Sequence, residues 1–593
     1  MPNTRGSPNP NIPPEEGLKK KKPPACDSCK ARRVLCHPTT DGTPCPRCIE
    51  KGTKCTTTPV TRGRPPKKHL GVVPATPPSA SESEPLSSTG SPYDSIGLLP
   101  PQESTRLLEL SPELVHHLFE CFAHLPQYSH PMFRGNILRK ALSSVSWKIH
   151  QLTPQQRVLA HCVVALSASI SYDHAILGIG PQPASFADRS VFMQGADLRS
   201  YGVRRAPMYR ALCAQALRLA CEAGILLEPS EDNAASCFFM QFLEIEKEAT
   251  SRPWAVAYFS HVRAIAASWN DTNVDPLHAV MWNSFLMLEA LETIGSRHPV
   301  LISHNDQLLI SGNEPLPLQN LFETVQTTMR TAKLQPHTVF RIMPSVFFHI
   351  TRLCRQLSEA IIGDFARRQP LNETAVTEFL SELTLLHSIR CLVFPPDEPN
   401  TASADPLFQG SPQTRSTHLH LRASAGTMVF SRTTMLLALH RELAHRAARA
   451  PTTMGQVAWA AERVELLRRQ VRELAFFAVE EIAHTLLVPS LPHLTHAYRG
   501  ALVACAQFCL DEAEPERVGV IEAFAGALKL VGYSWTPPAG LVERLEAYVD
   551  THRVAPLQLF EISTWRDMFP APLASDLMEL FAMPLGQPEP EGL

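Results

Sequence analysis

Apolar residues recur at helical spacing along most of this chain, from about residue 105 to about residue 565. Ser111-Pro112-Glu113 has the features of a helix start, because a capping hydroxyl group precedes a proline at the first helical position. No convincing run of alternating apolar and polar residues predicts a strand. The pattern predicts one large all-α domain over 105–565, with a Pro-rich exposed loop at 394–416.

Three further helix boundaries can be placed inside this domain. The stretch 207–223 puts small and apolar residues on one face, and Gly224 predicts its end. Ser230 opens the next helix, and Arg252-Pro253 opens a third that runs to about residue 269. The expected buried face of the first of these helices consists of Leu212, Ala216, Leu219, Ala220 and Ala223.

A long helix is predicted over residues 456–484. Apolar residues recur along it at heptad spacing, which is the pattern of a coiled-coil seam between two chains. The same pattern also describes a helix that packs inside its own bundle, and alanine at both ends favours that interpretation. The seam consists of Val457, Ala460, Val464, Leu467, Val471, Leu474 and Ala478.

The first 104 residues have a different character. Residues 71–104 contain seven prolines and eight serines, so they cannot bury enough apolar surface to fold and are expected to form a disordered linker. The prolines also exclude a coiled coil directly after the N-terminal segment. A homodimer would need another interface, and a monomer is the other option.

Charge is divided unevenly along the chain. Residues 1–70 carry 15 Lys plus Arg and 5 Asp plus Glu, which gives +10. The remaining residues carry 40 basic and 52 acidic side chains, which gives −12 and a total of −2. A basic end on an otherwise acidic protein indicates a nucleic-acid partner at that end.

Six cysteines fall within thirty residues of this basic end. Their spacing is Cys-x2-Cys-x6-Cys-x8-Cys-x2-Cys-x6-Cys, so the second half repeats the first. A tetrahedral zinc ion takes four sulfur ligands, so two separate ions would need eight. Six are enough for two zinc ions if two sulfurs bridge both metals. The six candidate ligands are Cys26, Cys29, Cys36, Cys45, Cys48 and Cys55.

Two other kinds of cysteine-rich structure compete with a zinc cluster. A disulfide framework is disfavoured, because no apolar signal sequence precedes the cysteines and the other nine of the 15 are scattered singly among apolar residues. A RING or LIM module needs eight ligands, and His37 is the only histidine between Cys26 and Cys55.

The segments CDSCKARRVLC, HPTTDGTP and CPRCIEKGTKC resemble the DNA-binding domain of the fungal Zn2Cys6 binuclear-cluster transcription factors. The resemblance implies that Cys26 and Cys45 bridge two Zn2+ ions. It further implies that Cys29 and Cys36 complete one zinc site and that Cys48 and Cys55 complete the other. Pro44 matches a loop proline that is common in the family.

A short helix is expected between Cys29 and Cys36, with Arg32 and Arg33 in its middle and Lys30 one turn before Arg33. So short a helix depends on the metal for its stability. The resemblance implies that this basic group reads a CGG-like triplet of double-stranded DNA in the major groove, where an arginine fork pairs with guanine. Contact with phosphate alone is the alternative.

The second half of the repeat is expected to clamp phosphate groups rather than to read bases, through Arg47, Lys51 and Lys54, although Glu50 interrupts the positive charge. Leu35 departs from the family, which often has a basic residue there.

A basic arm follows the cysteines. Arg62-Gly63-Arg64-Pro65 resembles an AT-hook, whose arginines enter the minor groove. A flexible phosphate-binding arm or a nuclear import signal is the other interpretation of Arg62 and Arg64. A second basic run at 19–22 also favours a nuclear location.

The long helical region resembles the fungal transcription factor regulatory domain, or middle homology region. The residues that carry this resemblance are ALCAQALRLACEAGIL, EDNAASCFFMQFLEIEK, SRPWAVAYFSHVRAIAASW and SPELVHHLFECFAHLPQYSHPMF. It implies an all-α regulatory domain that contacts coactivators or corepressors. The acidic and apolar C-terminal tail is a second candidate contact for such partners, or a last helix docked on the domain.

The full prediction is a sequence-specific transcription factor that regulates RNA polymerase II genes, with no enzymatic or membrane role. No P-loop or nucleophile elbow is present, and His440 and His445 are five residues apart rather than four. A zinc-scaffolded nuclear interaction protein without sequence-specific DNA binding is the alternative.

The expected fold is a small Zn2Cys6 domain with two short helices, joined by a disordered linker to a large all-α regulatory domain. The expected segments are a basic tail at 1–24, the Zn2Cys6 domain at 25–58, the arm and linker at 59–104, the regulatory domain at 105–565 and a tail at 566–593.

Overall fold

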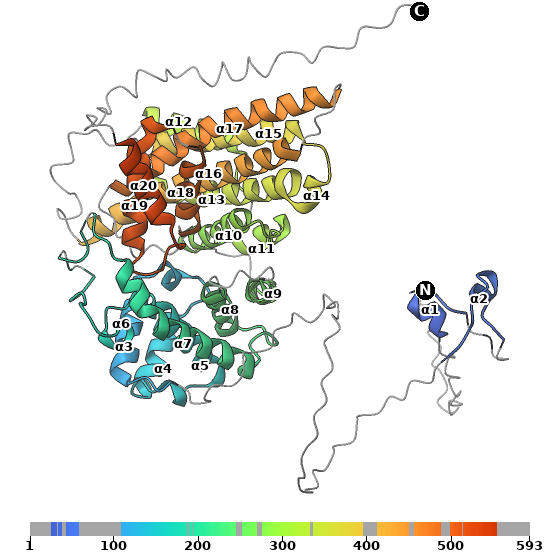
Figure 1. The fold of residues 1–593 in the computed structure, drawn as a ribbon. Coiled ribbons are helices and arrows are strands. Elements are labelled where there is room, and N and C mark those ends of the chain that lie inside the picture. Colours follow the sequence, from blue (N-terminus) through green and yellow to red (C-terminus); the bar gives the residue numbers. More distant parts are fainter. Residues whose placement is uncertain are drawn as a thin grey trace, which may run out of the picture. The chain divides into compact units, whose positions relative to one another are not determined.

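The computed structural model divides the chain into two compact units, Met1–Gln102 and Glu103–Leu593 (Figure 1). The predicted segments 1–24, 59–104 and 566–593 lie outside the residues that the structure describes, as does most of the predicted loop at 394–416. The described residues are 25–32, 34–37, 39, 43–57, 108–186, 188, 190–193, 195–244, 252–269, 276–312, 314–331, 336–394, 412–449, 456–487, 499–512 and 514–553.

The first unit contains two helices of five residues each, α1 (Asp27–Ala31) and α2 (Pro46–Glu50). The second unit is built from helices, and no strand occurs in the described part of either unit. The all-α prediction is therefore confirmed for these residues.

The first helix group of the second unit surrounds one apolar core, to which Phe122, Phe239 and Phe259 contribute large buried side chains. Its members are α3 (Pro112–Phe122), η1 (Pro126–Ser129), α4 (Gly135–Ser144), η2 (Ile149–Gln151), α5 (Pro154–Ala168), α6 (His174–Leu177), α7 (Arg199–Ala223), α8 (Glu231–Glu244) and α9 (Pro253–Ala266).

The second helix group has its own core, in which α16 packs against α10, α13, α15, α17 and α18. Helix α10 contributes to both cores, with Trp282 in the first and Ile294 in the second. The members of this group are α10 (Pro276–Ser296), α12 (Leu318–Thr331), α13 (Pro336–Leu357), the π-helical turn η3 (Ser358–Ile362), α14 (Asp364–Arg367), α15 (Glu373–Val393), α16 (Pro412–Arg449), α17 (Gln456–Leu487), α18 (Arg499–Glu512), η7 (Pro515–Arg517), α19 (Val518–Val531) and α20 (Leu541–His552). Helix α11 (His304–Ser311), although it follows α10 in the chain, places Ile310 in the first core.

The predicted helix boundaries are confirmed at four places. The Ser111 hydroxyl accepts a hydrogen bond from the Leu114 N–H at 3.2 Å and begins α3. Helix α7 ends at Gly224, which has a φ of 62°, and α8 and α9 begin where Ser230 and Arg252 predicted. Helix α7 also extends upstream to Arg199, because Pro207 inside it interrupts the hydrogen-bond ladder at the solvent-exposed Val203 rather than in the core.

The predicted heptad seam faces its own bundle. Val471 and Ala478 of α17 are fully buried in the second core, and the half-buried members pack against that core. The side chains of Val457 and Ala460 lie outside the described residues. Among the described residues, no helix has the length and apolar character needed to cross a membrane.

A buried charge joins the two helix groups. Arg205 of α7 is 2% exposed and donates hydrogen bonds to the carbonyl oxygens of Ser171, at 2.8 Å, and Tyr533. Its guanidinium group lies 4.5 Å from the centre of the Tyr533 ring. Beside it, α7 and the end of α19 approach so closely that a Cβ atom at Gly202 would lie 2.4 Å from the carbonyl oxygen of Gly532.

Replacing Gly202 with alanine should therefore destabilise the second unit by about 1–3 kcal/mol, since the added methyl group meets backbone that cannot move aside. The matched control is Gly526→Ala in the middle of α19, where nothing lies within 4 Å of the added Cβ atom. That change should stabilise the protein by about 0.5–1 kcal/mol. Urea unfolding followed by circular dichroism measures both, and equal effects of the two changes would contradict the close approach.

Candidate metal centre

The two halves of the cysteine segment have the same backbone geometry, offset by 19 residues. Cys26 precedes α1 with φ −67° and ψ 155°, and Cys45 precedes α2 with φ −62° and ψ 151°. Each is extended and acts as the residue before the helix, so its sulfur lies outside the first turn. The repeat in the spacing is therefore a repeat in the structure.

The two helices also end in the same way. The Val34 N–H donates to the Cys29 carbonyl at 3.1 Å, and the Thr53 N–H donates to the Cys48 carbonyl at 3.0 Å. This six-residue return is the hydrogen bond that closes a helix in the Schellman motif. Gly52 supplies the left-handed residue of the second half, with a φ of 58°.

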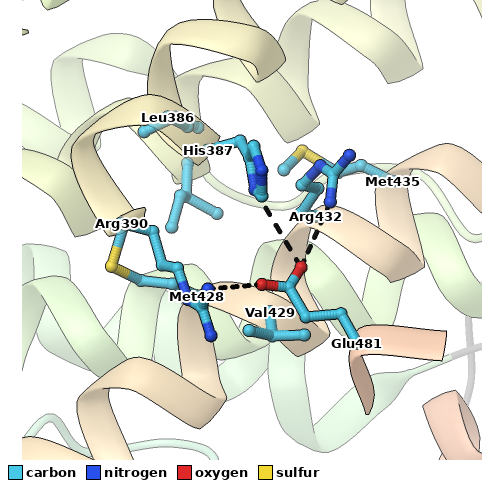
Figure 2. A pocket seen from close by; sticks show the side chains of 9 residues that line it. Leu386, His387, Arg390, Met428, Val429, Arg432, Met435 and Glu481 are labelled. Carbon is cyan, nitrogen blue, oxygen red and sulfur yellow. Dashed lines mark hydrogen bonds and ion pairs between the residues drawn. The ribbon is translucent and has the colours of Figure 1, made fainter. Parts of the chain in front are cut away.

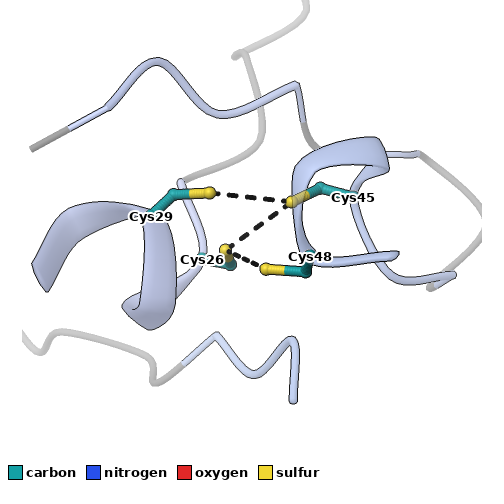
Figure 3. Close-up of side chains that lie close together, drawn as sticks. All are labelled: Cys26, Cys29, Cys45 and Cys48. Carbon is teal, nitrogen blue, oxygen red and sulfur yellow. Dashed lines mark hydrogen bonds between the residues drawn. The ribbon is translucent and has the colours of Figure 1, made fainter. Parts of the chain in front are cut away.

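Four cysteine sulfurs meet between the helices (Figure 3). Cys26, Cys29, Cys45 and Cys48 are buried, and their sulfur atoms lie within 4.8 Å of one another. The closest pairs are Cys26–Cys48 and Cys29–Cys45 at 3.7 Å, followed by Cys26–Cys45 at 3.9 Å. Such a group can hold a metal ion.

The other two predicted ligands are half-buried at the edge of this group. The Cys36 thiol lies 3.8 Å from the Cys26 sulfur, and the Cys45 N–H donates to the Cys55 sulfur at 3.4 Å. A backbone hydrogen bond from the Asp27 N–H to the Thr56 carbonyl, at 2.8 Å, joins the start of the segment to its end. All six predicted ligands are therefore gathered around one centre.

The electrostatics of the thiols differ within the group. A hydrogen bond from the Cys29 backbone lowers the pKa of Cys26 to about 6. Burial and the neighbouring sulfurs raise the pKa of Cys29. The hydrogen bond from the Cys45 backbone lowers the pKa of Cys55. Burial and the nearby sulfurs have the larger, opposite effect, and together they raise this pKa to about 12. Metal ions bind thiolates, so metal binding here would displace protons.

None of the 15 cysteines, all of which lie in the described part of the chain, forms a disulfide bond. The disulfide alternative therefore has no support in the structure. Outside the metal centre, most cysteines are buried singly in the helical unit, and Cys221 is exposed on α7.

The predicted DNA-contacting side chains are exposed where the structure describes them, and they lie on α1 and α2 or directly after these helices. The prediction for Arg32 needs a correction. Helix α1 ends at Ala31, so Arg32 is its C-cap residue and does not lie in the middle of the helix. The chain turns back at this point, which lets Cys36 approach Cys26. Arg33, Arg62 and Arg64 lie outside the described residues, and the exposed members are Lys30, Arg32, Arg47, Lys51 and Lys54.

Two apolar side chains on this surface were not predicted. Leu35 is 71% exposed and Ile49 is 65% exposed. Positions that correspond in the internal repeat thus carry side chains of different chemistry. Lys30 of the first half corresponds to Ile49 of the second, and Leu35 corresponds to Lys54. The repeat in the spacing alone could have identified these pairs.

Comparison with protein-family models, with curated proteins and with solved structures gives no match to this chain. The case for a function therefore depends on the metal centre itself.

Cobalt provides a direct test of the centre. The full-length protein should take up Co2+ and develop the visible absorption of a tetrahedral thiolate site, and Cys45→Ser should abolish most of it. Cys221→Ser is the matched control and should leave the spectrum unchanged, since that cysteine lies outside the group. A spectrum that survives loss of Cys45 would contradict the proposed ligand set.

Proposed function

We propose that this protein is a sequence-specific DNA-binding transcription factor that regulates RNA polymerase II genes through a two-zinc cluster. The observation that carries the proposal is the gathering of six cysteine sulfurs between two structurally equivalent basic halves. Zinc supplies the cross-link that holds the halves together, and it does no chemistry on a substrate.

The sulfur distances support two zinc ions that share two ligands. Four sulfurs around a zinc ion at about 2.3 Å lie about 3.8 Å apart along each edge of the tetrahedron. Four sulfur–sulfur contacts measure 3.7–3.9 Å, and every one of them includes Cys26 or Cys45. That is the pattern expected if these two sulfurs bridge both ions.

The same contacts support the assignment of the terminal ligands. Cys29 meets Cys45 and Cys36 meets Cys26, as expected for a first zinc site. Cys48 meets Cys26, and Cys55 accepts from the Cys45 backbone, as expected for a second.

DNA is the partner that the charges favour. Residues 1–70 carry +10, and two Zn2+ ions with six thiolates change this to +8. No ion pair within the described residues neutralises Lys30, Arg32 or Lys51, which leaves them available for phosphate groups or base edges. We propose that Lys30, Arg32 and Arg33 read a CGG-like triplet, while Arg47, Lys51 and Lys54 position the backbone.

The remaining parts of the proposal concern location and partners. The basic runs at 19–22 and 62–68 support entry into the nucleus, and Arg62 and Arg64 support an additional contact with DNA. Coactivators or corepressors would bind the helical unit or the C-terminal tail. The internal packing of α17 leaves a homodimer to form through another surface.

A nuclear interaction protein without sequence preference is the second candidate, favoured by the exposed Leu35 and Ile49 beside the metal centre. Selection of bound sites from random DNA by the full-length protein separates the two. Enrichment of one triplet supports the first candidate, and no enrichment supports the second.

Zinc content tests the bridging assignment. The wild-type protein should hold two zinc ions per chain, measured by elemental mass spectrometry. Cys45→Ser should lose both ions, since Cys45 is a ligand of each. Cys55→Ser should retain one, because Cys26, Cys29, Cys36 and Cys45 complete the first site. Equal losses in the two variants would contradict a shared ligand.

Equivalent positions in the two halves provide a matched test of DNA reading. Arg32 and Lys51 both follow their helix as the C-cap residue, so they differ in chemistry and not in backbone geometry. Arg32→Ala should cost about 1–3 kcal/mol on the selected sequence and relax the preference for it. Lys51→Ala should weaken binding to all sequences alike and reduce the slope of affinity against salt by about one.

Fluorescence anisotropy with the selected and a scrambled duplex, at several salt concentrations, measures these effects. Arg33→Ala should behave like Arg32→Ala. If all three variants lose affinity uniformly, the basic group contacts phosphate only.

A further inference from the structure

Four helices of the second unit enclose a group of charged side chains (Figure 2). Arg390 of α15 and Arg432 of α16 both point at the carboxylate of Glu481 on α17, with Nη1 atoms 2.7 Å and 3.2 Å from its oxygens. We call Arg390, Arg432 and Glu481 the Glu481 cluster. Apolar side chains complete the enclosure, among them Ile350 of α13 and Met428 and Met435 of α16.

The charges of the Glu481 cluster do not balance. Two guanidinium groups face one carboxylate, which leaves a net charge of +1. His387 lies 3.9 Å from Glu481, but burial and the two arginines lower its pKa to about 3, so its ring is neutral at physiological pH. Burial also lowers the pKa of Arg432, whose side chain is only 9% exposed. A buried charge without a counterion costs several kcal/mol.

The guanidinium groups also have donors to spare. The Nε atom of Arg390 is buried and has no hydrogen-bond partner among the described residues. Beyond its contact with Glu481, Arg432 lies with its guanidinium carbon 5.2 Å from the centre of the Phe477 ring, which offers no lone pair. Planar guanidinium groups carry five N–H donors each, so this cluster presents more donors than the single carboxylate can accept.

A second cluster of the same composition shows how the bundle closes such a site with protein atoms. Glu442 is fully buried and pairs with Arg367 and Arg446. There the other donors of Arg446 reach the carbonyl oxygens of Ile361, Ala366 and Gln369 at 3.0–3.1 Å. The Glu481 cluster has no comparable set of carbonyl acceptors among the described residues, and it borders a cavity instead.

The size of that cavity limits what it can hold. Its volume of about 10 Å³ is the space for the centre of one water-sized group. The cavity lies beside α15, where the side chains of His387 and Arg390 are 24% and 18% exposed, against 9% for Arg432. A small ion can therefore reach the cavity from the side of His387.

We propose that the cavity beside Arg390, Arg432 and Glu481 is a binding site for a small monovalent anion of the size of chloride. The anion accepts hydrogen bonds from the spare guanidinium donors and neutralises the excess positive charge. It thereby joins α15 and α16 to α17 and makes the stability of the second helix group depend on the anion. This site is separate from the metal centre, and its test does not depend on zinc or DNA.

Thermal unfolding of the full-length, zinc-loaded protein tests the site. Chloride replaces methanesulfonate, which is too large for the cavity, at constant ionic strength. The unfolding midpoint should rise by about 2–4 °C and then level off as the site saturates. Arg432→Met should remove this response. The matched control, Arg446→Met in the Glu442 cluster, should lower the midpoint but keep the response to chloride.

Glu481→Gln gives a test of opposite sign. Removing the carboxylate charge leaves two uncompensated guanidinium groups, so the response to chloride should become larger and saturate at a lower concentration. A purely structural role for the cluster predicts only a lower midpoint, with no change in the response to chloride.

Direct binding keeps the proposal testable if Arg432→Met fails to fold. Chloride-35 nuclear magnetic resonance lines should broaden in the presence of the wild-type protein and of Arg446→Met, and Arg390→Gln should lose the broadening. Identical midpoints in chloride and methanesulfonate would mean that the cavity holds water alone and would overturn the proposal. Equal responses in Arg432→Met and Arg446→Met would overturn it as well.

Discussion

The described part of the N-terminal unit depends on the meeting of its cysteine sulfurs, because those residues form no other core. The buried apolar cluster of this unit consists of Cys26, Cys29, Cys45 and Cys48, with Cys36 and Cys55 packed against it. The larger apolar side chains among the described residues of this unit, Val34, Leu35 and Ile49, are exposed. Two five-residue helices cannot persist alone in water, so a metal bound by the sulfurs would supply most of the folding free energy of this segment. Such a metal would also fix the two helices that carry Lys30 and Arg47.

Much of this unit could be predicted from the spacing of its cysteines, because a repeat of ligands at equal intervals requires a repeat of the backbone between them. The position of Arg32 could not be predicted in the same way. The length of α1 is set by the hydrogen bond from Val34 to Cys29 and by the return of Cys36 to the centre, and both are tertiary constraints. In the helical unit, the capping signals at Ser111 and Gly224 placed helix ends correctly because they act through local hydrogen bonds and local backbone geometry. The start of α7 was predicted at residue 207, because a proline usually begins a helix. The helix instead starts at Arg199 and tolerates Pro207 in its interior, where the chain faces solvent.

The chemistry inside the helical unit was beyond the reach of sequence patterns for a different reason. Arg390, Arg432 and Glu481 belong to three helices, with 42 residues from the first to the second and 49 from the second to the third, and no local periodicity connects them. What distinguishes their cluster from the one around Glu442 is the presence or absence of carbonyl acceptors from neighbouring turns, which only the fold determines. The heptad pattern of α17 was ambiguous for a related reason, because it records that a face is buried and not which helix covers it.

The hydrogen bonds of Arg205 have a consequence for co-translational folding. Its guanidinium group is shared between the carbonyl oxygens of Ser171 and Tyr533, and the second acceptor lies 328 residues downstream. During translation, the helices of the first group leave the ribosome with the Arg205 guanidinium group to be buried, while only the Ser171 acceptor has been synthesised. The first helix group can complete its packing around Arg205 only after nearly the whole polypeptide has left the exit tunnel. A nascent chain truncated before Tyr533 therefore holds an incompletely packed first helix group, which chaperones would recognise.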